Sequence, residues 1–287
     1  SASSGRASYT ETEKGITVKA NGRTFVFSKK DGQLKDVSVN NRKISFANGP
    51  RFIGARRADR SLDQFYNHDD EKAKAKDRTY SEFTDAAVFT KLDVKEEGGN
   101  LILTANYKLG NLDKAQWTIH PDGMATLDYT YNFSGVVDLM GICFDYPEEQ
   151  VLSKRWLGAG PYRVWQNRIH GAQYDIWEND YNDPIPGETF TYPEFKGYFG
   201  SVSWMSIRTK EGTISLTNET PDSYIGVYQP RDGRDRLLYT LPESGISVLN
   251  VIPPVRNKVN STDLCGPSSQ PKWVDGPQTG RLVLRFE

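Results

Sequence analysis

One stretch of the sequence, residues 156–204, concentrates aromatic rings and polar side chains. It holds 12 of the chain's 34 aromatic residues, and its glycines and prolines exclude regular strand over most of its length. The polar residues between the rings are Asn167, Arg168, His170, Asp175, Glu178, Asn179, Asp180 and Asp183. Pyranose rings offer apolar faces that stack on aromatic planes, and hydroxyls that need planar donors and acceptors. The composition therefore favours a sugar-facing surface. The alternative is that these rings pack a long loop back onto the body of the protein.

Several acidic residues in or near this stretch could support acid–base chemistry. Two carboxylates held about 5 to 9.5 Å apart can hydrolyse a glycosidic bond. Spacing in the sequence fixes no distance across loops, so we assign no catalytic residue. The candidates are Asp145, Glu148, Glu149, Asp175, Glu178, Asp180 and Asp183.

The histidines give two different predictions. His170 lies inside the aromatic stretch and is either a hydrogen-bonding or structural residue, or an acid–base residue acting on a sugar ring. His68 precedes Asp69 and Asp70, but charged residues follow, so this run is expected to be a solvated loop. We predict no metal site. Phosphate-binding glycine loops are missing from the sequence, and we predict no cofactor.

The elements that must position these residues are strands, because apolar residues recur with a period of two. Residues 101–109 place Leu101, Leu103, Ala105, Tyr107 and Leu109 on one face, and residues 125–133 repeat the pattern after a Pro-Asp-Gly turn. We predict an all-β fold, a large antiparallel supersandwich formed by a single domain over residues 15–287. Residues 1–14 are expected to be a linker or disordered start, and residues 261–280 are linker-like. Residues 62–77 are either a helix or a solvated insertion.

Composition limits the partners. A net charge of −1 argues against nucleic acid, which binds concentrated Lys and Arg. The sequence has no apolar run of about 20 residues, so we expect no membrane partner. The two cysteines, Cys143 and Cys265, are either buried thiols or a single bridge.

The segment Arg155-Trp156-Leu157-Gly158-Ala159-Gly160-Pro161, followed by Asn167-Arg168, resembles a known signature. The signature, W-hydrophobic-G-x-G-P-x-E-x-Y-x-D-R, belongs to the C-terminal β-sandwich domain of the β-galactosidases of glycoside hydrolase family 2, the small-chain-like domain 5. Weaker similarities at residues 15–18, 24–27, 30–34, 49–52 and 248–250 extend the resemblance over most of residues 15–287.

The resemblance implies a galactose-mutarotase-like fold and a place beside an active site built by a separate (β/α)₈ barrel domain. The family's catalytic acid and nucleophile are Glu residues of that barrel, which this chain lacks. It also implies that Trp156 lines the substrate entrance as a stacking platform. The acidic residues of the signature are replaced within residues 163–168, whereas Arg168 is kept. The expected ligand is a galactoside or a plant-type oligosaccharide, and the relatives suggest a periplasmic or extracellular location.

The leading functional hypothesis is a non-catalytic domain of a β-galactosidase-like glycoside hydrolase that shapes the carbohydrate entrance. Two alternatives stay open: a free-standing epimerase, hydrolase or lyase of the same fold, and a domain–domain interaction module. The expected substrate-binding residues are Trp156, Trp165, Arg168, His170 and Trp177. The expected partners are a carbohydrate and the catalytic barrel domain of the parent chain.

Overall fold

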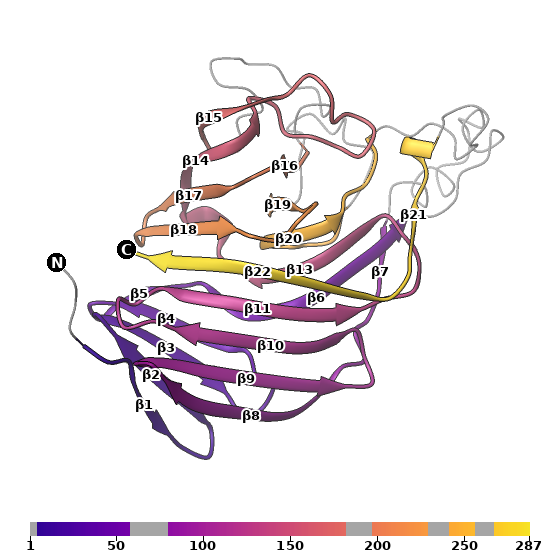
Figure 1. The fold of residues 1–287 in the computed structure, drawn as a ribbon. Coiled ribbons are helices and arrows are strands. Elements are labelled where there is room, and N and C mark those ends of the chain that lie inside the picture. The colour runs from indigo at the N-terminus through magenta and orange to yellow at the C-terminus, as the bar shows by residue number, and fades with distance from the viewer. Residues whose placement is uncertain (1–4, 58–79, 182–196, 229–240, 256–266) are drawn as a thin grey trace.

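The computed structural model describes residues 5–57, 80–181, 197–228, 241–255 and 267–287. These residues form antiparallel strands and two short 3₁₀ helices, η1 (Glu148–Gln150) and η3 (Pro267–Ser269), with no α-helix among them. Two large sheets enclose a shared core, as Figure 1 shows. The predicted all-β antiparallel supersandwich is confirmed.

The first sheet contains eleven strands of the described chain. Its main path runs in the order β1 (Ser8–Glu11), β2 (Gly15–Ala20), β3 (Arg23–Ser28), β4 (Leu34–Val39), β6 (Ala47–Arg57), β13 (Leu139–Asp145), β20 (Ile246–Val251), β19 (Tyr224–Val227) and β16 (Phe199–Gly200). Two short strands lie off this path: β5 (Arg42–Ile44) pairs with β4, and β7 (Tyr80–Glu82) pairs with β6.

The second sheet contains nine strands, stacked in Figure 1 from β15 at the top to β8 at the bottom. Their order is β15 (Gln173–Asp180), β14 (Val151–Gly160), β17 (Trp204–Thr209), β18 (Thr213–Asn218), β22 (Pro277–Phe286), β11 (Ala125–Asn132), β10 (Leu112–Ile119), β9 (Asn100–Lys108) and β8 (Val88–Glu97). A small third sheet pairs β12 (Gly135–Val137) with β21 (Lys272–Val274). The aromatic stretch therefore begins on β14, at one end of the second sheet.

The strand faces follow the alternation in the sequence. Leu101, Leu103 and Ala105 of β9 are fully buried, and the inward residues of β11 are buried in the same core. Leu109 departs from the prediction, because β9 ends at Lys108 and Leu109 turns away with a φ of 70° and 81% of its surface exposed. Aromatic rings connect the two sheets: Phe27 meets Trp117 edge to face at 5.9 Å between ring centroids.

Two segments expected to be linkers contain strands. Ser8–Glu11 pairs with β2 through backbone hydrogen bonds, although all four of its residues are exposed. Because neither face of this edge strand is buried, its sequence shows no alternation of apolar and polar residues. Residues 261–280 include β21 and the start of β22; Pro277 is tolerated because it occupies the first position of its strand. Residues 62–77, the expected helix or insertion, lie outside the described residues. The described residues include no helix that is long and apolar enough to cross a membrane.

Candidate functional site

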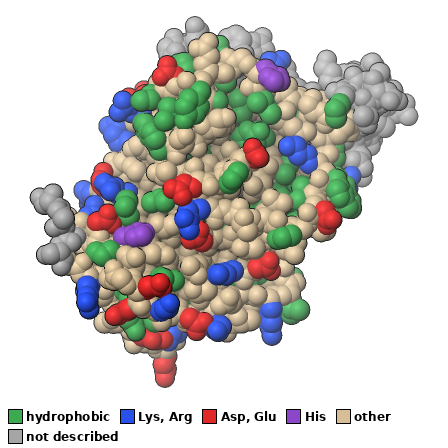
Figure 2. Space-filling view, in the orientation of Figure 1, with side chains coloured by type: hydrophobic (Ala, Val, Ile, Leu, Met, Phe, Trp, Pro, Cys, Tyr) green, Lys and Arg blue, Asp and Glu red, His purple; other side chains and the backbone are tan. Residues whose placement is uncertain are grey.

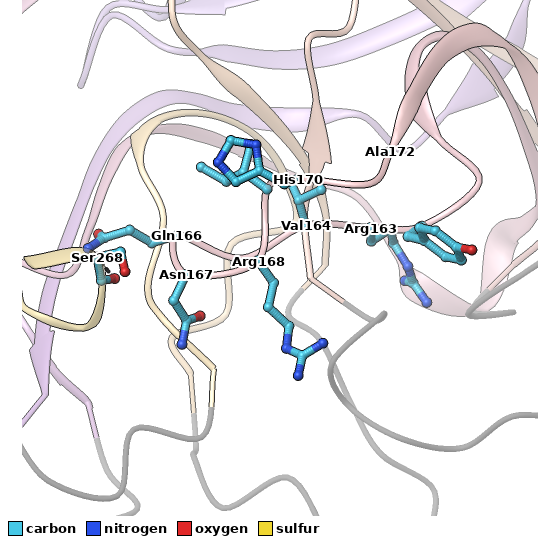
Figure 3. A pocket seen from close by; sticks show the side chains of 10 residues that line it. Arg163, Val164, Gln166, Asn167, Arg168, His170, Ala172 and Ser268 are labelled. Atoms are coloured by element: carbon cyan, nitrogen blue, oxygen red, sulfur yellow. Dashed lines mark hydrogen bonds between the residues drawn. The ribbon is translucent and has the colours of Figure 1, made fainter. Parts of the chain in front are cut away.

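A pocket of about 520 Å³ lies beside the loop that joins β14 to β15. Figure 3 shows the side chains of Asn167 and Arg168 extending from the loop in one direction and His170 in another. Arg168 and His170 are both exposed. The structure therefore brings two of the predicted site residues to one pocket. Its lining consists of Tyr162, Arg163, Val164, Gln166, Asn167, Arg168, Ile169, His170, Ala172 and Ser268.

Trp165 anchors the loop rather than facing the pocket. Its ring is fully buried and meets Tyr198 edge to face at 5.8 Å between centroids. The neighbouring Val164 and Tyr198 exchange two backbone hydrogen bonds of 2.7 Å. The amide of Arg168 donates to the carbonyl of Trp165 at 2.9 Å, which closes a tight turn. Packing of Trp165 thus fixes the direction of the arginine that follows it. The structure thus places Trp165, a predicted substrate-binding residue, in the core of the loop and outside the described pocket lining.

Two amide side chains hold the loop against the C-terminal part of the chain. The Gln166 Nε2 donates to the carbonyls of Ser268 and Gln270, each at 2.8 Å. Asn167 pairs with the backbone of Val255: its Nδ2 donates to the carbonyl at 3.0 Å and its Oδ1 accepts from the N–H at 2.9 Å. The side-chain nitrogen and the side-chain oxygen of Asn167 are therefore both hydrogen-bonded. Arg168 and His170 carry the exposed polar side chains of the loop.

Trp156 is also a core residue and not a surface platform. Its side chain is fully buried, its Nε1 donates to the Ala159 carbonyl at 3.0 Å, and its ring meets Phe199 edge to face at 4.9 Å. The structure thus places Trp156, the predicted stacking platform, inside the core. The physical reason is the alternation of β14, which points Trp156 towards the inside of the sandwich, opposite Met205 of β17.

Trp177 is half-buried and covers a glycine. Its Nε1 donates to the Gln173 carbonyl at 3.1 Å, and a Cβ built on Gly160 would lie 2.4 Å from its ring. Gly160 is therefore needed for the close approach of the Trp177 ring to β14. Trp177 does not line the pocket described above.

None of the candidate carboxylates that the structure describes lines the pocket. Asp145 pairs with Arg51 at 2.8 Å, and Glu148 accepts a hydrogen bond from the Tyr181 hydroxyl. Three more lie on β15 and are exposed: Asp175, Glu178 and Asp180. Asp183, His68 and Cys265 lie outside the described residues. Across the ranges that are described, no cluster of three or more His, Cys, Asp or Glu could hold a metal. Burial raises the pKa of the Cys143 thiol to about 11, which leaves it protonated at neutral pH.

Comparison with known proteins decides the family. The sequence model of the β-galactosidase small chain matches residues 19–250, which is most of the chain. The chain belongs to this family. The resemblance predicted from residues 155–168 is thereby confirmed, and a β-galactosidase small-chain domain implies a larger enzyme that contains a catalytic domain. No curated protein matches the sequence.

Solved structures similar to this small-chain domain include several carbohydrate enzymes. A galactose 1-epimerase from Lactobacillus acidophilus NCFM is 8% identical at a TM-score of 0.49, and the match covers 99% of this chain and 99% of the epimerase. A putative aldose 1-epimerase from Escherichia coli K12 is 12% identical over 98% of this chain and 99% of its own, at a TM-score of 0.42. An α-N-acetylgalactosaminidase from Bifidobacterium bifidum is 11% identical at a TM-score of 0.45. The match covers 94% of this chain and 36% of that enzyme.

The outer face of the small-chain domain is apolar at one corner. Leu157 of β14 lies opposite Ile176 of β15 and Trp204 of β17, so these three residues share a face. With Ala159 and Tyr174 they form what we call the apolar corner; Ile176 and Tyr174 expose 48% and 58% of their surface. On other strands of this face Gln116, Asp128 and Arg281 are polar, whereas Ile102 and Val283 are apolar and half-buried. In Figure 2 hydrophobic side chains gather over the upper part of the molecule, where Figure 1 places β14 and β15.

Trp273 is a candidate that the sequence did not single out. It lies on β21 and exposes 71% of its surface, the most of any tryptophan that the described ranges contain. It lies three residues after Gln270, whose carbonyl accepts a hydrogen bond from Gln166 of the pocket loop. The available signal was a tryptophan in a short segment without alternation, between Pro271-Lys272 and Val274-Asp275-Gly276. It was missed because the segment was predicted to be a linker.

Proposed function

We propose that this small-chain domain is a non-catalytic part of a β-galactosidase-like enzyme and forms a wall of its carbohydrate entrance. The observation that carries the proposal is the pocket beside the β14–β15 loop, which combines exposed Arg168 and His170 with a lining that has no carboxylate among its described residues. Hydrolysis by two carboxylates needs a closely spaced pair, and the described lining of this pocket offers none. Its role is therefore to bind and orient a sugar.

The pocket is rich in hydrogen-bond donors. The Arg168 guanidinium carries a planar fork of N–H groups, and His170 adds a ring nitrogen. Sugar hydroxyl and ring oxygens accept such bonds, while the partly exposed ring of Tyr162 offers an apolar surface beside them. We infer that the ligand is a galactoside or a plant-type oligosaccharide, placed against a catalytic domain that supplies both carboxylates.

The apolar corner supports a partner for this wall. It adjoins the pocket, because β14 and β15 flank the loop that forms it. A cluster of exposed apolar side chains of this kind is suited to a protein contact. We propose that the catalytic barrel domain of the parent enzyme covers the corner, and that the enzyme works in the periplasm or outside the cell, where polysaccharides are found.

The test uses the complete enzyme that carries this chain. Arg168→Ala and His170→Ala should raise KM for an oligosaccharide substrate about tenfold, the cost of one charge-assisted hydrogen bond, with kcat nearly unchanged. Arg285→Ala is the matched control, since Arg285 is an exposed arginine of β22 outside the pocket. The isolated chain should hydrolyse no nitrophenyl β-galactoside.

Two results would contradict the proposal. Steady hydrolysis by the isolated chain would show that it is an enzyme by itself. Equal KM values for Arg168→Ala, His170→Ala and Arg285→Ala would remove the pocket from the substrate path.

A further inference from the structure

A second hollow, of about 590 Å³, is bounded by residues of both sheets and shares no lining residue with the pocket of the proposed function. We call it the inter-sheet hollow. The turn between β3 and β4 contributes Lys30, the first sheet contributes Arg51 and Glu82, the segment after β7 contributes Thr84, and the second sheet contributes Phe89 and Tyr107.

The rings of the hollow are partly open. Phe89 meets Tyr107 edge to face at 5.9 Å between centroids, and Phe83 stacks on Phe133 at 5.4 Å with 16° between the ring planes. Phe83, Phe89 and Tyr107 are each half-buried, whereas Phe52 behind them is buried in the core. These three rings keep part of their surface towards the hollow, which suits a flat apolar face of a ligand.

Two carboxylates shape the hollow. Asp85 accepts hydrogen bonds from the backbone N–H groups of Ala87, Asn111 and Leu112, at 3.0, 2.6 and 3.2 Å. These contacts fix the segment that carries Phe83 and Phe89 against the end of β9. The Asp85 carboxylate is thus committed to the backbone around it.

Asp31 and Tyr107 hold the opposite wall. The Asp31 carboxylate pairs with Lys35 at 2.7 Å, and the Asp31 carbonyl accepts a hydrogen bond from the Tyr107 hydroxyl at 2.6 Å. Burial, together with Asp31 and Asp85, raises the pKa of Tyr107, so the phenol stays neutral. Arg51 is turned towards Asp145, 2.8 Å away. The walls are therefore set before any ligand arrives.

The rim leaves polar groups in solvent: Lys30, Glu82 and Thr84 are exposed. A wholly apolar ligand would desolvate these groups without pairing them, which is costly. Among the described residues, the exposed charges of the rim are one cation, Lys30, and one anion, Glu82, so the rim favours neither sign of ligand charge, and Arg51 already has a carboxylate partner. A neutral ligand with apolar ring faces and hydroxyl edges meets both the rings and the rim.

We propose that the inter-sheet hollow is a second saccharide-binding site, which takes a neutral disaccharide. One sugar ring stacks on the open rings of Phe83 and Phe89, and hydroxyls at its edge donate to the Glu82 carboxylate and bond to Thr84. The inference does not depend on the proposed function, because the two sites have no residue in common.

The experiment is a titration of the isotope-labelled chain with lactose, followed by the amide signals of Gly32 and Thr84. These signals should shift in a saturable way up to about 50 mM lactose, the range in which millimolar binding is complete. Glu82→Gln should weaken this binding about tenfold, and Phe89→Leu about three- to tenfold. Arg168→Ala should leave it unchanged.

The matched control is Glu97→Gln, an exposed acid of β8 outside the hollow, which should bind lactose as the unchanged chain does. Glu82→Gln guards against a folding artefact, since Glu82 is exposed and its replacement has the same shape. The proposal is overturned if the Gly32 and Thr84 signals do not move, or if Glu82→Gln and Phe89→Leu bind lactose as well as Glu97→Gln does. Neither result would alter the assignment of the loop pocket.

Discussion

Trp156 is enclosed on every side. Its indole N–H is satisfied by the Ala159 carbonyl, and its ring lies against Phe199. Replacing a buried tryptophan by alanine leaves a cavity that costs about 3–5 kcal/mol. We therefore expect Trp156→Ala to lower the free energy of unfolding by this amount, measured by urea denaturation. Trp273→Ala, at an exposed ring, should leave it within about 0.5 kcal/mol of the unchanged value. A Trp156→Ala variant as stable as Trp273→Ala would contradict the core assignment.

Single residues of the site were only partly readable from the sequence. The family signature pointed to Arg168, and its position inside the aromatic stretch pointed to His170; the structure places both in the lining of one pocket. Trp156 and Trp165 were assigned to the wrong surroundings, because a tryptophan ring is suited both to stacking on a sugar and to filling a core. The choice between these roles depends on the direction of β14 and on the partner Tyr198, which is far away in the sequence.

The turn between β17 and β18 connects the two sheets through Glu211. Its carboxylate accepts hydrogen bonds from the backbone N–H and hydroxyl of Ser45, at 2.9 and 2.6 Å, and from the Tyr146 hydroxyl at 2.8 Å. Ser45 lies between β5 and β6, and Tyr146 follows β13. All three donor groups therefore belong to segments that adjoin strands of the first sheet. Burial alone would raise the pKa of Glu211, but these hydrogen bonds outweigh it and lower the pKa.

A lowered pKa in the folded state predicts the pH dependence of this link. The ionised carboxylate stabilises the fold above the pKa that Glu211 has in the unfolded chain, and the contribution is lost as pH falls through the lower folded pKa. Glu211→Gln should therefore destabilise the domain at pH 7 and match the unchanged chain at pH values below both pKa values. Denaturation measured across this range tests it. A constant difference between the two proteins at every pH would contradict the account.

Elements were predictable where one face is buried. Strands β9 and β11 were found because burial imposes alternation on them. The edge strand β1 and the short β21 were not, because their pairing is made by the backbone and their side chains carry no pattern. The apolar corner was also missed. Its members come from β14, β15 and β17, and become neighbours through register, which the sequence does not display.

The whole molecule depends on a strand at the end of the described chain. β22 lies between β11 and β18, and so joins the part of the second sheet made by residues 88–132 to the part made by residues 151–218. Residues 277–286 lie beyond the segment matched by the family, residues 19–250. A single sandwich was expected from length and alternation. This late strand explains physically how its two halves become one sheet.

Leu284 tests whether the halves unfold together. It is fully buried, opposite Ala125 of β11 on one side and Leu216 of β18 on the other. Leu284→Ala should cost about 2–5 kcal/mol. If the shared core makes one cooperative unit, the amides of β10 and β17 should lose hydrogen-exchange protection equally, whereas Leu109→Ala, at an exposed site, should change neither. Loss of protection confined to β17 or to β10 would mean that the halves unfold separately. Equal loss would mean that the wall carrying the β14–β15 loop is as stable as the sandwich behind it, which is what a fixed binding surface requires.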